Sequence, residues 1–192
     1  FVTPELKEYE EKILNAEDEI HKIEHQIFLE AVEKVMTFFE SIAKTADIIA
    51  QIDVLLSFSI IANENSYVMP QIAQGGEVVI KDGRHPVIEK FQKEMYIPND
   101  LELNHDKQEL LLLTGPNMSG KSSFLRQTAL ICLMSQIGSF VPAKAAQISI
   151  VDRIFTRVGA SDNLAQGIST FMAEMQEAAN IINNATKDSL II

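Results

Sequence analysis

Helix-breaking residues are absent from a long N-terminal stretch. Between Pro4 and Pro70 the sequence contains neither glycine nor proline, and this absence predicts helix through most of the first sixty residues. Thr3 suits the N-cap position, Pro4 the first helical position and Glu5 the positive end of the helix dipole. An unbroken helix to Ile61 would be about 90 Å long, and a kink or break within it fits the sequence equally well.

Cysteine and long apolar runs are also scarce. Cys132 is the single cysteine, so an internal disulfide is excluded, and its place in the apolar run 129–134 indicates core packing in a reducing cytoplasm. No apolar run approaches the roughly eighteen residues of a membrane-spanning helix, and no charged region followed by an apolar stretch opens the chain. We therefore expect a soluble protein that is not exported and has no membrane partner.

Basic residues are outnumbered and do not cluster. The chain has 16 Lys and Arg against 27 Asp and Glu, a formal net charge of −11. Residues 1–65 hold 14 of these acidic residues and only five of the basic ones. Tight DNA binding uses many Lys and Arg side chains to neutralise phosphates. If the protein binds DNA, we expect other parts of it to make the main contact.

Apolar residues of the predicted helical region repeat every seven positions. Two such sets are offset by three places: Leu6, Ile13, Ile20 and Ile27, and Tyr9, Ala16 and Ile23. This spacing is typical of a coiled-coil seam. After Phe28 the apolar residues become denser, which predicts that the later part of the helical region is buried more widely.

The polar residues 63–66 end the helical region and mark a domain boundary. We predict a helical arm, residues 1–65, and a second domain, residues 66–192, in which glycine and proline separate short segments such as 78–80. Both ends look cut, because Phe1 is not an initiator Met and Ile192 lies in an apolar run.

The second half of the chain alternates strand and helix signals. From Glu109 we predict a buried strand at 110–113, a glycine-rich turn and a helix to about Ile137. A strand at 148–155, a helix from about Thr170 and a strand still in progress at 190–192 follow. This alternation is typical of an α/β fold.

The strongest chemical signal is a phosphate-binding loop. Residues 115–122 fit G-x-x-x-x-G-K-[ST] at every fixed position, between the predicted strand and helix. Backbone N–H groups and the helix N-terminus of such a loop surround phosphates. Lys121 would reach the β- and γ-phosphates, and Ser122 would place its hydroxyl on Mg²⁺. We expect ATP or ADP with Mg²⁺, bound by Gly115, Pro116, Asn117, Met118, Ser119, Gly120, Lys121, Ser122 and Ser123.

The segments around this loop resemble the MutS family, in its bacterial form. Five segments in order match its signature regions: 114–123, 125–127, 136–143, 151–162 and 169–175. Upstream, residues 3–10 resemble the return of the DNA clamp into the lever helices, and residues 83–89 an early ATPase-domain motif. The resemblance implies part of a P-loop NTPase domain of the ABC-ATPase-like type, truncated before the Walker B carboxylates and preceded by a long helical lever arm.

This resemblance carries functional expectations. It implies a DNA-dependent ATPase of DNA mismatch repair, whose ATP cycle controls its grip on DNA and its repair signalling. It implies a homodimer or a heterodimer with a paralogue, mismatched double-stranded DNA bound by parts outside this chain, downstream repair proteins, and a cytoplasmic, nucleoid-associated location. Because the Walker B carboxylates are missing, we expect the chain alone to hydrolyse little or no ATP.

Two residues outside the loop take roles from the same resemblance. Tyr96 matches an aromatic residue that stacks on adenine, although a part-buried core or strand-edge tyrosine would give the same signal. Ser169 suits an N-cap, and the resemblance implies that it also reaches across the dimer interface to the γ-phosphate on the partner's P-loop. Three positions depart from the family pattern: Ser123, Asn163 and Ile168. The last two weaken a functional role for charges in 162–167.

The histidines give weaker signals. His21 and His25 fit the zinc spacing H-x-x-E-H, but the heptad frame puts both on the solvent side and no third ligand is marked, so we expect no zinc site. We expect His85 to be a hydrogen-bonded structural residue and His105 to lie on a surface loop.

Three other interpretations stay open. One is a MutS relative that acts on recombination intermediates, and another is a long-helix ATPase of the same class with a different mechanical task. The third is a pseudo-ATPase that serves as an interaction scaffold. The family segments disfavour the second, and intact Lys121 and Ser122 disfavour the third.

Overall fold

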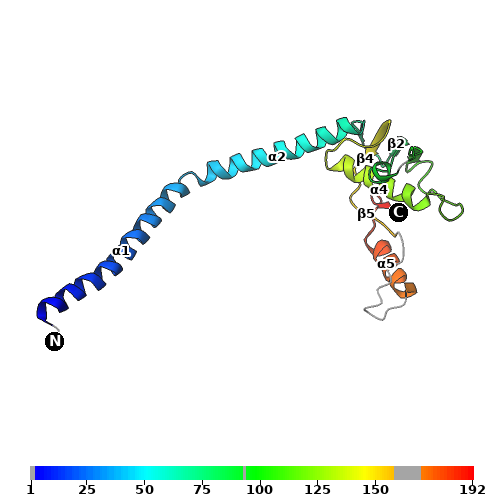
Figure 1. Cartoon of the computed structure of the whole chain (residues 1–192). Helices are drawn as coiled ribbons and strands as arrows, with labels where there is room; N and C mark the ends of the chain where they lie inside the picture. Colours follow the sequence, from blue (N-terminus) through cyan, green and yellow to red (C-terminus); the bar gives the residue numbers. More distant parts are fainter. Residues whose placement is uncertain (1–2, 93, 158–169) are drawn as a thin grey trace. The chain divides into compact units, whose positions relative to one another are not determined.

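The computed structural model of the chain describes residues 3–92, 94–157 and 170–192 (Figure 1). The chain forms two compact units, Phe1–Leu55 and Leu56–Ile192. The second unit begins inside a helix, and the domain boundary near residue 66 remains a prediction.

The first unit is helical. α1 spans Pro4–Met36, and the Thr3 hydroxyl accepts a hydrogen bond from the Leu6 N–H at 3.3 Å, which confirms the predicted N-cap. α2 spans Phe39–Glu64. Between them, Thr37 and Phe38 form a turn in which the Thr37 hydroxyl donates to the Lys34 carbonyl at 2.7 Å. The helical region is therefore broken at a point that the sequence left unplaced.

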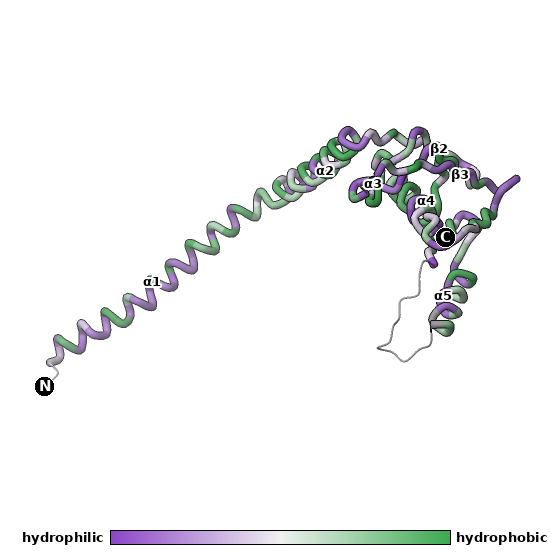
Figure 2. The backbone as a smooth tube through the Cα atoms, turned by 45° about the vertical axis from the view of Figure 1, so that its right-hand side comes forward, coloured by the Kyte–Doolittle hydropathy of each residue, from purple (hydrophilic) through white to green (hydrophobic). Residues whose placement is uncertain are grey.

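Most apolar side chains of these two helices are exposed. Across the described part of α1 no residue is buried, and in α2 only Ala62 is. α1 alternates between hydrophilic and hydrophobic residues, whereas α2 is mainly hydrophobic (Figure 2). The prediction of wider burial after Phe28 is wrong for this chain, because burying a helix face needs a second element packed against it.

α2 also corrects the expectation about long apolar segments. It is long and apolar enough to cross a membrane, by length and composition alone. Asp47 and Asp53 interrupt its apolar runs, so the segment contains no long unbroken apolar run although it is apolar on average. One such helix is weak evidence for a membrane segment, since core helices of soluble proteins meet the same criterion.

The second unit is built on a mixed four-stranded sheet. Its strands are β1 Gln71–Ala73, β2 Val78–Gly83, β3 Asn99–Leu103 and β4 Ala145–Ser149, in the spatial order β1-β4-β2-β3. β2 is antiparallel to both β3 and β4, and β1 is parallel to β4. The predicted segment at 78–80 thus becomes a central strand, and the mixed α/β class is confirmed.

One helix shares the hydrophobic core with this sheet. α4 spans Lys121–Gln136 and contributes Ile131 and Cys132, which join Ile80 and Ile148 of the sheet. All four side chains are fully buried. The prediction that Cys132 packs in the core is confirmed.

The remaining elements are short strands and two helices. α3 spans Ile88–Phe91, α5 spans Thr170–Asn184, and β5 Ile154–Phe155 pairs in parallel with β6 Leu190–Ile191. The predicted strand at 148–155 is wrong in its middle. The Gln136 amide exchanges two hydrogen bonds with the Val151 backbone, at 3.0 and 2.7 Å, and so takes the place of a neighbouring strand.

The predicted buried strand at 110–113 is also wrong. These residues form no strand, and the side chains of Leu110 and Leu112 are 84% and 81% exposed. A strand needs a neighbour for its N–H and C=O groups, and no named strand of the described chain pairs with this segment.

Candidate nucleotide-binding site

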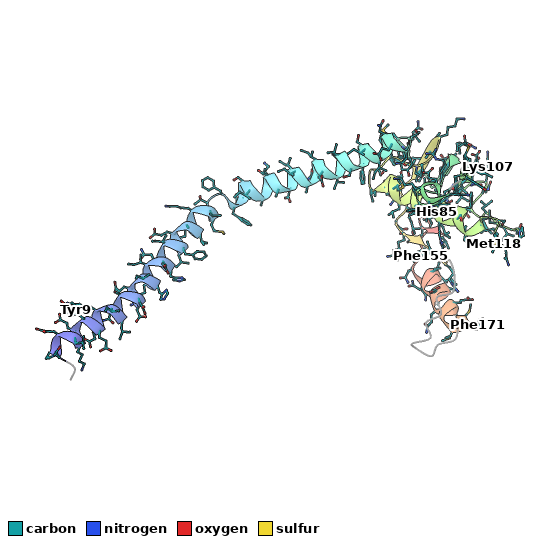
Figure 3. All side chains as sticks on the ribbon, in the orientation of Figure 1. Tyr9, His85, Lys107, Met118, Phe155 and Phe171 are labelled. Atoms are coloured by element: carbon teal, nitrogen blue, oxygen red, sulfur yellow. The ribbon has the colours of Figure 1, made fainter. Side chains whose placement is uncertain are left out.

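The glycine-rich loop has a backbone that favours glycine at two of its positions. Gly115 has φ 149° and Gly120 has φ 88°, and Met118 between them also has a positive φ of 63°. Gly120 is the residue immediately before α4. Its carbonyl accepts a hydrogen bond from the Phe124 N–H at 2.9 Å, in the pattern of an α-helix. Met118 is fully exposed and points away from the body of the unit (Figure 3).

Lys121 folds back over this loop. Its ammonium donates to the carbonyl oxygens of Gly115 at 2.7 Å and Pro116 at 2.5 Å, and lies 3.5 Å from the Ser119 hydroxyl. The first N–H groups of an α-helix have no intrahelical acceptor and carry partial positive charge. A cation and the free N–H groups of α4 therefore meet at one end of this loop, which is the chemistry of an anion site.

The donor set also decides what cation the site suits. The hydroxyl of Ser122, in the first turn of α4, is exposed. Mg²⁺ prefers oxygen ligands and is commonly held by one or two protein groups together with phosphate oxygens. No cluster of three His, Cys, Asp or Glu residues occurs in the described part of the chain. The residues therefore fit a magnesium ion bound with a nucleotide.

Tyr96 is hydrogen-bonded to the same helix, α4. Its hydroxyl donates to the Gln127 amide oxygen at 2.8 Å, and Gln127 is buried six residues beyond Lys121 in α4. Burial, and then the nearby Glu89 carboxylate, raise the pKa of Tyr96. Stacking of this ring on a base remains a prediction. Sequence reasoning missed Gln127, although this glutamine lies four residues before the core residue Ile131 and so on the same, largely buried face of the helix.

A polar network around Arg84 was also missed. Its guanidinium lies 2.7 Å from the Glu89 carboxylate and donates to the Asn65 carbonyl, just past α2, at 2.8 Å. The Tyr67 hydroxyl donates to the same carboxylate at 3.2 Å. Burial first, and then Glu89, raise the pKa of Tyr67 to about 12. The network connects the end of α2 to α3.

One of the four histidines is buried and three are exposed. His85 is buried, and its Nδ1 accepts hydrogen bonds from the N–H groups of Val87 and Ile88 at 3.2 and 3.3 Å. The prediction that His85 is hydrogen-bonded is confirmed, and burial lowers its pKa. His105 is exposed beside Glu109, as expected. His21 and His25 are exposed on α1, and their lack of a zinc role remains a prediction.

Ser169 lies outside the described residues, as do Asn163 and Ile168. The helix predicted to follow Ser169 does begin at Thr170, as α5. Arg157 of the preceding segment binds this helix through Glu174 at 2.7 Å and Glu177 at 2.9 Å. The trans role of Ser169 therefore stays a prediction.

Comparison with known proteins identifies the class of domain to which the loop belongs. Residues 111–192, which contain the loop, α4 and α5, match the family model of MutS domain V, the ATPase domain of these proteins. The DNA mismatch repair protein MutS of Acetivibrio thermocellus is 53% identical over 193 residues, covering 100% of this chain and 22% of the relative. The MutS proteins of Alkaliphilus metalliredigens and Clostridium novyi are 55% and 54% identical, and the chain covers 22% and 21% of them.

The matches to these three MutS proteins extend across the whole chain, including both N-terminal helices. The chain belongs to the MutS family of DNA mismatch repair proteins, as its sequence segments predicted. It spans about a fifth of the length of the curated relatives that it matches.

Proposed function

We propose that this chain binds ATP and ADP as part of a P-loop NTPase domain of the ABC-ATPase-like type. The whole protein would recognise mismatched double-stranded DNA and use its ATP cycle to control its grip on DNA and its signalling to downstream repair proteins. The observation that carries this proposal is the Lys121 ammonium held over the loop that opens α4. Because such a protein would act on chromosomal DNA, its proposed location is the cytoplasm, at the nucleoid.

Each loop residue has a separate part in this proposal. The backbone of 115–120 surrounds the phosphates, supported by Asn117, while Lys121 exchanges its carbonyl partners for phosphate oxygens. Ser122 and Ser123 present N–H groups and hydroxyls at the start of α4, with the Ser122 hydroxyl on Mg²⁺. The metal ion would offset the charge on the phosphates. Tyr96 would stack on the base.

Replacing Lys121 with alanine in the full-length protein tests the loop. We expect about 10- to 100-fold weaker binding of ADP by calorimetry, the effect of losing a charged hydrogen bond. Lys144→Ala is the matched control, because that side chain is 78% exposed and paired with Asp82 on the sheet. Unchanged ADP affinity in the Lys121 variant would exclude the assignment.

The proposed dimer has a composite catalytic site, with Ser169 of one subunit acting on the γ-phosphate held by the other. Ser169→Ala should then bind nucleotide normally and lose hydrolysis, whereas a simple N-cap would cost only about 1 kcal/mol of stability. A heterodimer of this variant with a Lys121→Ala subunit carries both defects in one site and leaves the other site intact. Activity should partly return, and a verified heterodimer without any activity would exclude the trans role.

A further inference from the structure

Gln127 is an unusually placed polar side chain. It is only 1% exposed, and lies on the face of α4 that also carries the buried Ile131. A buried amide is costly unless it is hydrogen-bonded. The Tyr96 hydroxyl supplies that bond at 2.8 Å to the amide oxygen, so the side chains of Gln127 and Tyr96 depend on each other.

The nitrogen side of the amide lies beside Gly83. Gly83, at the end of β2, has no side chain where Gln127 approaches: an added Cβ would lie 2.7 Å from the amide nitrogen and 3.2 Å from the Asn99 carbonyl oxygen. Gly83 is the register partner of Asn99, the first residue of β3. The Gln127 amide therefore lies close to Gly83, in space that a side chain at this position would fill together with the Ile80 side chain.

This arrangement leaves only part of Tyr96 open to a ligand. Its neighbours Met95 and Ile97 are 92% and 80% exposed, while Tyr96 itself is half-buried. Its hydroxyl is bonded to Gln127, so only the ring would be left to contact a base. Gln127, which binds the Tyr96 hydroxyl, lies six residues from Lys121, or about 9 Å along the axis of α4.

We propose that Gln127 is a positioning residue for the nucleotide base. It holds Tyr96 so that the ring face, and not the hydroxyl, meets the base; this rests on the proposed function of the loop. Every base has a π-face, so stacking tolerates different bases. Tyr96 therefore contributes affinity for purine nucleotides without distinguishing adenine from guanine, and selection between them lies elsewhere.

The experiment compares three ligands on the full-length protein by calorimetry: ADP, GDP and inorganic pyrophosphate. Tyr96→Ala should weaken the binding of ADP and of GDP by the same factor, about tenfold, and leave the affinity for pyrophosphate unchanged. Tyr96→Phe and Gln127→Leu should each weaken the binding of ADP and of GDP equally, and by less than Tyr96→Ala does. Because both remove one interaction, the double variant should be no weaker than the poorer single variant.

Gln136→Leu is the matched control. It makes the same substitution in the same helix, and removes hydrogen bonds to Val151, which the proposal does not connect with the base. It should leave the ratio of ADP to pyrophosphate affinity unchanged.

Three outcomes would overturn the proposal. Equal loss of pyrophosphate affinity in Gln127→Leu would make the residue a support of α4 alone. A changed ADP to GDP ratio in Tyr96→Phe would mean that the hydroxyl reads the base. Normal ADP binding by Gln127→Leu, together with weakened ADP binding by Tyr96→Ala, would show that Gln127 does not position Tyr96. Failure of the unaltered protein to bind any of the three ligands would instead defeat the proposed function.

Discussion

Gly120 and Gly138 lie at opposite ends of α4 and have the same kind of backbone. Their φ values are 88° and 84°, and an added Cβ would meet nothing within 4 Å at either position. Alanine should therefore cost each variant a similar amount, about 1–2 kcal/mol of stability, from the left-handed conformation alone. The two positions differ in function, because only Gly120 belongs to the proposed phosphate loop.

We expect Gly120→Ala to lose most of its ADP affinity and Gly138→Ala to keep it. The open space beside Gly120 is where a phosphate would approach the backbone, and a methyl group would occupy it. Thermal melting measures the shared strain, and calorimetry measures binding. Equal ADP affinities in the two variants would show that the position is only a helix cap.

Cys132 predicts a dependence of stability on alkaline pH. Burial raises the pKa of its thiol from 9.0 to about 12. Between these values the unfolded chain has released the proton that the folded chain keeps, so the free energy of unfolding falls as pH rises, by up to about 1.4 kcal/mol per pH unit. Below this range the contribution of the thiol is complete.

Urea unfolding of the protein and of Cys132→Ala, from about pH 8 to pH 11, tests this. The variant lacks the thiol, so its stability should fall less steeply over that range. Parallel curves for the two proteins would mean that Cys132 is accessible to solvent in the folded state.

How far the sequence predicted single residues depended on whether their role is local. Lys121 and Ser122 were found because the chemistry of a phosphate loop requires fixed residue types within eight consecutive positions. Gln127 and Arg84 were missed because their partners, Tyr96 and Asn65, are distant in sequence. Nothing in a linear pattern brings such pairs together before the sheet and α4 have been assembled.

At the scale of elements, the ion pair of Arg84 and Glu89 joins α3 to the end of α2. Their side chains are only 22% and 15% exposed, so water screens the pair weakly. Glu89→Gln should lower the free energy of unfolding by about 1.5–3 kcal/mol, the range for hydrogen bonds to charged groups. Lys81→Met is the control: its pair with Asp100 is half exposed and should be worth less than about 1 kcal/mol.

A second measurement separates this pair from a general loss of packing. The Glu89 carboxylate helps to raise the pKa of Tyr67 to about 12. Spectrophotometric titration of Glu89→Gln should therefore place this phenol at a lower pKa. Unchanged stability and unchanged tyrosine titration together would contradict the network.

Helices were better predicted than strands, for a physical reason. α1 begins at Pro4 as expected, and α4 ends at Gln136, one residue from the expected end, since caps and periodicity act within one segment. A strand depends on a neighbour. Residues 110–113 have strand-like composition without a paired strand, and the segment after Ser149 bonds to a glutamine side chain instead.

At the scale of the whole chain, the charge makes a prediction about DNA. With a net charge of −11, concentrated in residues 1–65, the 192-residue chain should bind duplex DNA weakly or not at all. Fluorescence anisotropy at about 50 and 200 mM salt measures this, with the full-length protein as the positive control. Tight binding by the chain alone, with a steep loss of affinity at the higher salt, would place the DNA contact here.

The turn at Thr37 and Phe38 interrupts the regular backbone hydrogen bonding between α1 and α2. At this point the Phe38 N–H donates to the Val35 carbonyl, three residues back, at 3.0 Å instead of four residues back. An uninterrupted hydrogen-bond ladder resists twisting about its axis, and an irregular turn resists it much less. The hydrogen-bond ladders of α1 and α2 are therefore not continuous, and we expect the chain to twist more readily at Thr37 and Phe38 than within either helix.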